Sequence, residues 1–327
     1  MTTAEILAQI PKLSALVIGD ICLDRWCFYD PAEAEPSRET GLPRLGVVAT
    51  EVTPGAGGTV ANNLAAMGVG RVAVIGAVGD DGFAYELRKA LADRSIDGSR
   101  LVVAPGIQTF TYSKLINLDN GVEDLPRVDF VTNIPLDKAT ERKVLEHVHA
   151  SLDEFDLIFV ADQAETSRGG VVTEGLRDLL ADLAPSYPEK IFLADSRQRV
   201  ELFRGLILKP NQHEAKTACT KLFGSVNFAE LRRQTESKLL IVTRGGDGVV
   251  LVTEEGEQRV PTRKVPKPVD ICGAGDSFSA AAGAALFVSR SPETAARFGN
   301  LAASVTICKR GTGTASPEEL IRADAAC

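Results

Sequence analysis

Short apolar runs recur along the chain and alternate with segments of helical character. The first run is Ala15–Ile18, and similar runs cover residues 72–78, 157–160, 191–194, 205–208 and 239–242. Helical stretches lie between them at 61–67, 84–93, 136–152, 172–183 and 229–237. Runs that are apolar throughout are typical of strands buried on both faces, and their alternation with helices favours a mostly parallel sheet. The sequence therefore predicts an α/β sandwich that binds ligands at the carboxyl ends of its strands.

Two segments interrupt this alternation, at residues 25–53 and 101–133. Within them, 109–116 and 127–131 alternate polar and apolar residues at period two, which is typical of half-buried strands. We interpret the two segments as a small antiparallel β lid inserted in pieces into one domain that spans residues 1–327. Ordinary surface hairpins are the alternative interpretation. A further hairpin is predicted at 249–261.

Composition and charge exclude several classes of protein. A net charge of −8 and 44% hydrophobic residues describe a globular chain without general affinity for nucleic acid or anionic membranes. No apolar run reaches the roughly 18–20 residues of a membrane helix, and residues 1–11 lack the order of a signal peptide. The six cysteines form no CxxC pair, so we expect free thiols and a cytoplasmic protein. Only three histidines are present and none pairs with a cysteine at ligand spacing, which argues against a zinc site.

The segment Asp270–Asp276 is the most informative motif. It places Gly273, Ala274 and Gly275 directly before a run of small residues that predicts a helix. A helix start offers free backbone N–H groups and partial positive charge to a phosphate, and glycine lets the ligand come close. Asp276 would lie beside that anion and take a proton from an attacking hydroxyl. The alternative is a helix start at which the aspartate is only a cap.

Two motifs of similar kind lie upstream and share this ambiguity. Residues 54–63 form a glycine-rich turn that enters a helix, with Asn62 as a possible ligand contact. Asp20 and Asp24 follow the first predicted strand, where a carboxylate accepts bonds from sugar hydroxyls or simply caps a turn. A strand-to-helix turn without a ligand explains the glycines equally well.

Two later motifs suit a nucleotide. Asn211 and Glu214 have the spacing of a capping box, and the same oxygens suit Mg²⁺ and its waters. Residues 243–248 carry three glycines at the end of a predicted strand, which is typical of a hairpin turn or of a loop against nucleotide phosphates. The segment 309–314 is another flexible polar loop.

The order and spacing of these motifs resemble the ribokinase-like (PfkB) carbohydrate kinase family over residues 14–322. The resemblance implies a three-layer α/β/α sandwich with a β lid and ATP-dependent phosphorylation of a sugar hydroxyl. It implies Asp276 as the base and Gly273, Ala274 and Gly275 as the anion hole. Implied ATP contacts are Asn211, Glu214, Thr243, Gly245 and Asn300, and implied substrate contacts are Asp24, Gly57, Gly58 and Asn62.

The same resemblance implies cofactors and an assembly. ATP and Mg²⁺ are expected, with Mg²⁺ held by Glu214 through water. Many members also bind a monovalent cation such as K⁺, which falls here on Asp270, Cys272, Thr306, Lys309, Gly311 and Ala315, mostly through carbonyl oxygens. Family dimers commonly form through the lid, so a homodimer is expected.

Within the family, the chain is most similar to the kinases of heptose 7-phosphate, through residues 19–26 and 309–320. Such kinases are often fused to a nucleotidyltransferase, and because this sequence ends at Cys327 we expect the kinase activity alone. The segment 30–45 departs from the heptose kinase pattern, and Ile271 replaces a frequent threonine. The acceptor therefore stays open. A sugar phosphate would need cations, for which Arg25, Arg38, Arg44, Lys114 and Arg127 are available. A free sugar or nucleoside would need hydroxyl partners or an aromatic stacking face, such as Trp26, Phe28, Phe110 or Tyr112.

Two other functions compete with the kinase. A sugar or nucleotide sensor would keep the fold without turnover, although a mere binder has no need of Asp276 as a base. A Rossmann-type oxidoreductase is disfavoured, because no G-x-G-x-x-G follows the first predicted strand.

Overall fold

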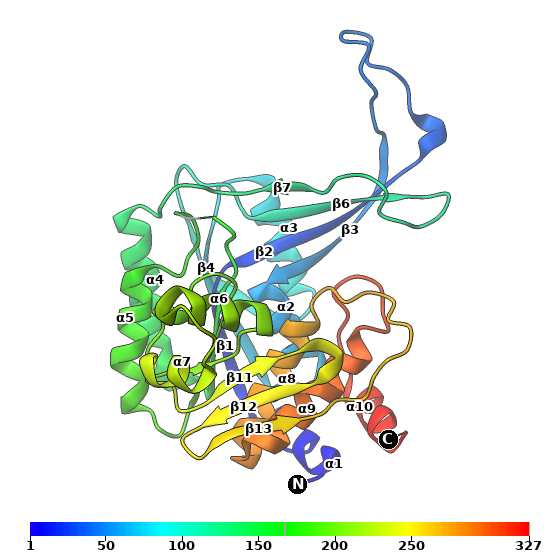
Figure 1. The fold of residues 1–327 in the computed structure, drawn as a ribbon. Coiled ribbons are helices and arrows are strands. Elements are labelled where there is room, and N and C mark those ends of the chain that lie inside the picture. Colours follow the sequence, from blue (N-terminus) through cyan, green and yellow to red (C-terminus); the bar gives the residue numbers. More distant parts are fainter. Residues whose placement is uncertain (167, 327) are drawn as a thin grey trace.

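The computed structural model describes residues 1–166 and 168–326. Among these residues, a nine-stranded sheet forms the centre of the molecule, in the order β13-β12-β11-β10-β9-β8-β1-β4-β5 (Figure 1). Neighbouring strands run parallel from β5 to β11, and β12 and β13 are antiparallel additions at one edge. The strands are β1 (Ser14–Gly19), β4 (Arg71–Val78), β5 (Ile96–Val103), β8 (Leu157–Asp162), β9 (Ile191–Ser196), β10 (Ile207–Leu208), β11 (Leu240–Thr243), β12 (Val249–Thr253) and β13 (Gly256–Val260). The prediction of a mostly parallel α/β sheet is confirmed.

Helices cover both faces of this sheet. One face carries α1 (Thr3–Leu7), α2 (Gly57–Ala66), α3 (Gly82–Ala92), α8 (Ala274–Ser289), α9 (Pro292–Thr306) and α10 (Pro317–Ala325). The other face carries α4 (Lys138–Ser151), α5 (Glu174–Leu183), α6 (Gln212–Phe223) and α7 (Phe228–Gln234). Short 3₁₀ helices lie at Ile10–Lys12, Pro31–Glu33, Leu152–Glu154, Ala184–Ser186, Val200–Leu202 and Gly245–Asp247.

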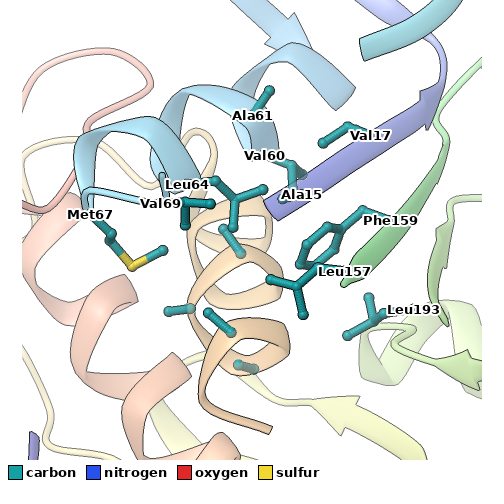
Figure 2. Close-up of a cluster of buried hydrophobic side chains, with 14 of the residues drawn as sticks. Ala15, Val17, Val60, Ala61, Leu64, Met67, Val69, Leu157, Phe159 and Leu193 are labelled. Carbon is teal, nitrogen blue, oxygen red and sulfur yellow. The ribbon is translucent and has the colours of Figure 1, made fainter. Parts of the chain in front are cut away.

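Alternate residues of each central strand enter separate cores. Ala15 and Val17 of β1 face α2 and α8, whereas Leu16 and Ile18 point into the core under α4 and α5 (Figure 2). This alternation follows from the period of two in a β-strand, and it explains why both sets of positions are apolar. Helix α8 lies very close to β8: a Cβ on Gly283 would be 2.5 Å from Cζ of Phe159. Only glycine therefore allows α8 this position over the sheet.

A second, smaller sheet forms the lid. Its order among the described residues is β3-β2-β6-β7, with β2 at Ile21–Tyr29, β3 at Val47–Ala56, β6 at Thr111–Asn117 and β7 at Val128–Phe130. The β2–β3 and β6–β7 pairs are antiparallel, and β2 and β6 run parallel. Residues 101–103 belong to β5 of the main sheet, and the segment between β2 and β3 extends far beyond the rest of the lid (Figure 1). The predicted lid therefore exists, with one parallel pair in it.

Within the described residues, no helix combines the length and the apolar character that a membrane crossing needs. Cys22, Cys27, Cys219, Cys272 and Cys308 are free thiols. The prediction for Cys327 lies outside the described residues.

Candidate active site

The glycine-rich segment before α8 leads to a helix start that no side chain of the described residues caps. Gly273 precedes the helix with a left-handed φ of +75°, and a Cβ there would lie 3.2 Å from Cγ2 of both Thr59 and Thr312. The N–H of Ala274 donates to the carbonyl oxygen of Ile271 at 3.2 Å, so Ala274 takes part in the turn before the helix. The uncapped first turn leaves its partial positive charge to whatever fills the space in front of it.

Asp276 projects from this first turn and lines two cavities. Burial raises the pKa of Asp276 to about 7, and nearby Asp195 adds to the increase while Lys209 and Arg197 oppose it. A carboxyl group with this pKa takes up and releases a proton near neutral pH, which suits a general base.

The first cavity, the lid cavity, has a volume of about 80 Å³ and lies between the lid and the start of α8. It is lined by Asp24, Arg25, Trp26, Ala56, Thr59, Tyr112, Lys114, Arg127, Gln163, Arg197, Cys272, Gly273, Asp276 and Thr312. Phe28, Phe110, Arg38 and Arg44 are not among these residues. Arg44 instead pairs with Glu35 at 3.7 Å on the exposed extension of the lid.

Basic side chains outnumber acidic ones among the described residues that line the lid cavity. Of its described lining residues, four are cations and two, Asp24 and Asp276, are acids. Each cation pairs with an acid that does not line the cavity: Arg25 with Glu86, Lys114 with Glu123, Arg127 with Asp129 and Arg197 with Glu165. An anionic group in the cavity would therefore meet cations from several sides.

The predicted substrate residues occupy different depths. Asp24 lines the lid cavity, and burial raises its pKa to about 6 although Lys114 and Arg127 oppose the increase. Gly57 and Gly58 are buried at the start of α2, and Asn62 is buried one turn further on. Their neighbours Ala56 and Thr59 line the cavity in their place. A sugar contact from Gly57, Gly58 or Asn62 stays a prediction.

Asp20 has a structural role instead of a place at the cavity. Its side chain is fully buried and accepts backbone N–H bonds from Gln163, Ala164 and Val171 at 2.7–2.8 Å. These bonds join the end of β1 to the loop after β8. Of the two alternatives for Asp20, the structure favours the structural one over a sugar contact, because both carboxylate oxygens already accept backbone N–H bonds.

The second cavity, the outer cavity, has a volume of about 980 Å³ and brings together all five predicted ATP-site residues. Gly273, Ala274, Gly275 and Asp276 form the boundary that it shares with the start of α8. The predicted ATP-site residues that line it are Asn211, Glu214, Thr243, Gly245 and Asn300. Its size suits a nucleotide.

Asn211 and Glu214 cap α6 and face the outer cavity as well. Oδ1 of Asn211 accepts the N–H of His213 and of Glu214, and Oε2 of Glu214 accepts the N–H of Asn211 at 2.7 Å. Burial raises the pKa of Glu214 to about 7, with nearby Asp195 adding to the increase. A divalent cation would relieve this excess of negative charge. The described residues contain no cluster of three or more metal-binding side chains. The oxygen atoms of Asn211 and Glu214 fit a Mg²⁺ ion that ATP phosphates and water help to hold.

Lys209 and Asp195 are functional candidates that sequence reasoning missed. They form a buried ion pair at 2.9 Å, and both line the outer cavity beside Glu214. A Cβ on Gly275 would lie 3.7 Å from Nζ of Lys209, so this ammonium group sits under the start of α8. Lys209 lies two residues before Asn211, at the start of the motif that contains Asn211 and Glu214. This position next to predicted ATP-site residues was the signal that could have identified it.

The residues of the predicted monovalent cation site come from two segments, one before α8 and one that begins at the end of α9. Asp270 accepts the N–H of Cys272 at 2.9 Å and of Gly311 at 3.1 Å, and the N–H of Lys309 donates to Thr306. The ammonium group of Lys309 donates to the carbonyl oxygen of Thr314 and to Glu319. A K⁺ ion between these two segments, with Ala315 among its ligands, stays a prediction.

A nucleotide-sized cavity and a cation-lined cavity meet at an uncapped helix start, at the carboxyl edge of a parallel sheet. This is the arrangement that a phosphotransferase needs. The family model described as pfkB family carbohydrate kinase matches residues 14–319. The chain therefore belongs to the PfkB family of carbohydrate kinases.

Curated relatives match nearly the whole chain. The Bifunctional protein HldE of Rhodopseudomonas palustris (strain BisA53) is 28% identical over 97% of this chain. The protein of the same name from Bradyrhizobium diazoefficiens is 29% identical, also over 97% of the chain. In each case, the chain spans 64% of the relative's own length.

Solved structures show the same fold at lower identity. The phosphofructokinase-2 of Escherichia coli, in complex with potassium, has a TM-score of 0.71 and 20% identity, with 96% of this chain and 99% of that chain covered. The ribokinase of Thermotoga maritima has a TM-score of 0.69 and 20% identity over 95% of this chain and 99% of that chain.

Proposed function

We propose that the protein transfers the γ-phosphoryl group of ATP to a hydroxyl group of a phosphorylated sugar, with heptose 7-phosphate as the first acceptor to test. The observation that carries this proposal is the set of cations around the lid cavity, directly beside Asp276. A neutral sugar needs hydrogen-bond partners for its hydroxyl groups, whereas a phosphate needs cations such as Lys114 and Arg127. The similarity to heptose 7-phosphate kinases points to the same class of acceptor.

In the proposed reaction, Asp276 accepts the proton of the sugar hydroxyl group while that oxygen attacks the γ-phosphorus. The new P–O bond to the sugar forms as the bond between the γ-phosphorus and its bridging oxygen breaks, and ADP leaves with that oxygen. The amides at the start of α8 face the oxygens of the transferred group and stabilise their charge. Asn211, Glu214, Thr243, Gly245 and Asn300 bind and orient the nucleotide. Glu214 would help to hold Mg²⁺ through water, and the ion would supply further charge neutralisation.

The aromatic residues of the lid cavity support a nucleoside acceptor less well. The guanidinium group of Arg127 lies over the ring of Tyr112, 5.0 Å from its centroid. This contact already uses one face of that ring. The indole ring of Trp26 packs against Gly311, since a Cβ on Gly311 would lie 2.8 Å from Cζ2 of Trp26. Neither ring is therefore an open stacking platform.

The test is a comparison of ATP-dependent turnover with heptose 7-phosphate, hexose phosphates, ribose and nucleosides. We expect kcat/KM for a phosphorylated sugar to exceed that for its neutral counterpart by at least about 10²-fold, the equivalent of two charge-assisted hydrogen bonds. Lys114→Met should raise KM for the phosphorylated acceptor about tenfold and leave KM for ATP unchanged. Lys143→Met, at an exposed position of α4, is the matched control.

Other results would redirect the assignment. A preference for ribose or a nucleoside would contradict the phosphorylated acceptor and leave the kinase assignment intact. Nucleotide binding without turnover on any acceptor would favour a sensor.

We further propose that the protein acts as a cytoplasmic homodimer that associates through the lid. Support comes from the free thiols of the described cysteines and from exposed apolar residues on the lid, among them Leu42, Val47, Val48 and Val122. Sedimentation of the full chain tests the assembly.

A further inference from the structure

Of the described residues, four line both the lid cavity and the outer cavity. They are Gln163, Arg197, Gly273 and Asp276. A phosphoryl group that moves from a nucleotide in the outer cavity to an acceptor in the lid cavity must pass between these residues. Gly273 and Asp276 belong to the start of α8, and Gln163 is neutral. Arg197 is thus the cation at the crossing point.

The position of Arg197 is fixed from two sides. Its Nε donates to Oε1 of Gln163 at 2.8 Å, and its Nη1 pairs with Glu165. Its backbone N–H donates to the carbonyl oxygen of Asp162, which attaches the residue to the end of β8. The side chain is nevertheless 47% exposed, and it lines both cavities. The guanidinium group is therefore oriented by the protein and still accessible to a ligand.

The other cations of the site lie on one side of the crossing. Lys209 lines only the outer cavity, where Asp195 holds its ammonium group at 2.9 Å. Lys114 and Arg127 line only the lid cavity. A cation that stays in contact with the transferred group through the whole reaction must lie at the boundary between the two cavities. Among these cations, only Arg197 lies there.

We propose that Arg197 is a catalytic residue that binds the oxygens of the γ-phosphoryl group and holds this group as it leaves ADP for the acceptor. This catalytic role of Arg197 rests on the proposed phosphoryl transfer. A planar guanidinium group suits this task, because it presents parallel N–H donors to two phosphoryl oxygens at once. Arg197 itself gains and loses no bond: the γ-phosphorus exchanges the bridging oxygen of ADP for the sugar oxygen, and the proton goes to Asp276.

The experiment measures binding of two nucleotides to the full chain by calorimetry. The probes are the magnesium complex of ADP and that of the non-hydrolysable β,γ-methylene analogue of ATP. Arg197→Gln should weaken binding of the triphosphate analogue by about 10- to 100-fold, the range for a lost charge-assisted hydrogen bond. Binding of ADP should change less than about twofold, because ADP lacks the γ-phosphoryl group. Arg197→Lys, which keeps the charge and loses the planar fork, should fall in between.

Arg204→Gln is the matched control, because Arg204 is an exposed arginine that pairs with exposed Asp178 and lines neither cavity. Its binding of both nucleotides should equal that of the wild type. Thermal unfolding of each variant checks that the fold is intact, which the exposure of Arg197 leads us to expect. In turnover assays, Arg197→Gln should lower kcat at saturating ATP at least about tenfold.

Two results would overturn the assignment of Arg197. One is equal binding of the triphosphate analogue by Arg197→Gln and the wild type. The other is a raised KM for the acceptor with unchanged nucleotide binding, which would place Arg197 on the acceptor. The wild type could phosphorylate no acceptor and still prefer the triphosphate in a way that depends on Arg197. This result would contradict the proposed function and support the contact between Arg197 and the γ-phosphoryl group.

Discussion

Replacement of Asp276 by asparagine should abolish most of the activity and at the same time stabilise the fold. The carboxyl group is the proposed base, and burial near Asp195 raises its pKa from 3.8 to about 7. A raised pKa means that the ionised group is less stable in the folded chain than in the unfolded one. Asparagine keeps the shape of the side chain without the charge. The ionised carboxylate of Asp276 should therefore destabilise the fold, and Asp276→Asn should remove this destabilisation.

The size of this effect follows from the pKa. The folded protein binds the Asp276 proton more tightly than the unfolded chain, so wild-type stability falls as pH rises from about 4 to about 7. A difference of about three pKa units corresponds to about 4 kcal/mol, at about 1.4 kcal/mol per unit. Because the side chain is partly open to the two cavities, we expect about half of this, ~2 kcal/mol, above pH 7. Below pH 4 the difference should vanish.

The assay combines urea unfolding of the wild type and Asp276→Asn at pH 4 and pH 8 with turnover at pH 8. We expect the variant to lose at least about 10²-fold in kcat and to gain stability only at the higher pH. Asp178→Asn, at an exposed position, is the control. A variant equally active as the wild type would refute the role as base. A difference in stability that does not depend on pH would refute the raised pKa.

Three further predictions concern the pH dependence of activity, the surroundings of Trp26 and the buried carboxylate of Asp20. The kcat/KM for the acceptor should rise with pH around an apparent pKa near 7, because the proposed base Asp276 acts only in its ionised form. A flat profile between about pH 5.5 and 8.5 would contradict this. Gly311→Ala should shift the fluorescence of Trp26, the only tryptophan. The new Cβ at position 311 would lie 2.8 Å from the indole ring, and the φ there is +66°. Gly41→Ala is the control without such a shift, because Gly41 has a similar φ and open space around it. Asp20→Asn should lower the free energy of unfolding by roughly 2 kcal/mol in urea titrations, because an amide nitrogen cannot accept the backbone N–H bonds that the carboxylate accepts; unchanged stability would show that these bonds are dispensable.

Local patterns predicted the elements well. Apolar runs marked β1, β4, β8, β9 and β11 because a strand buried on both faces has no polar position. The hairpin of β12 and β13 was also predicted correctly. Helix α6 was anticipated only by its cap, since its surface carries many polar residues.

Single residues that serve backbone or charge networks were harder to assign. Asp20 and Asp24 follow the same strand and look alike in sequence, but only Asp24 reaches the lid cavity. Their difference depends on the loop after β8, which is about 140 residues away in the chain and binds Asp20. No local pattern encodes such a contact.

The sequence by itself determined the order of strands and helices, the glycine-rich helix start with Asp276, and the motifs that predicted the family. These features depend on residues close together in the chain, through hydrogen-bond period, caps and backbone freedom. Only the tertiary structure decided which side chains share the boundary between the two cavities. Arg197 and Gln163 come from the ends of β9 and β8, and α8 brings Asp276 to the same place. Parallel packing places the strand ends at one edge, so their neighbours in space are distant in sequence.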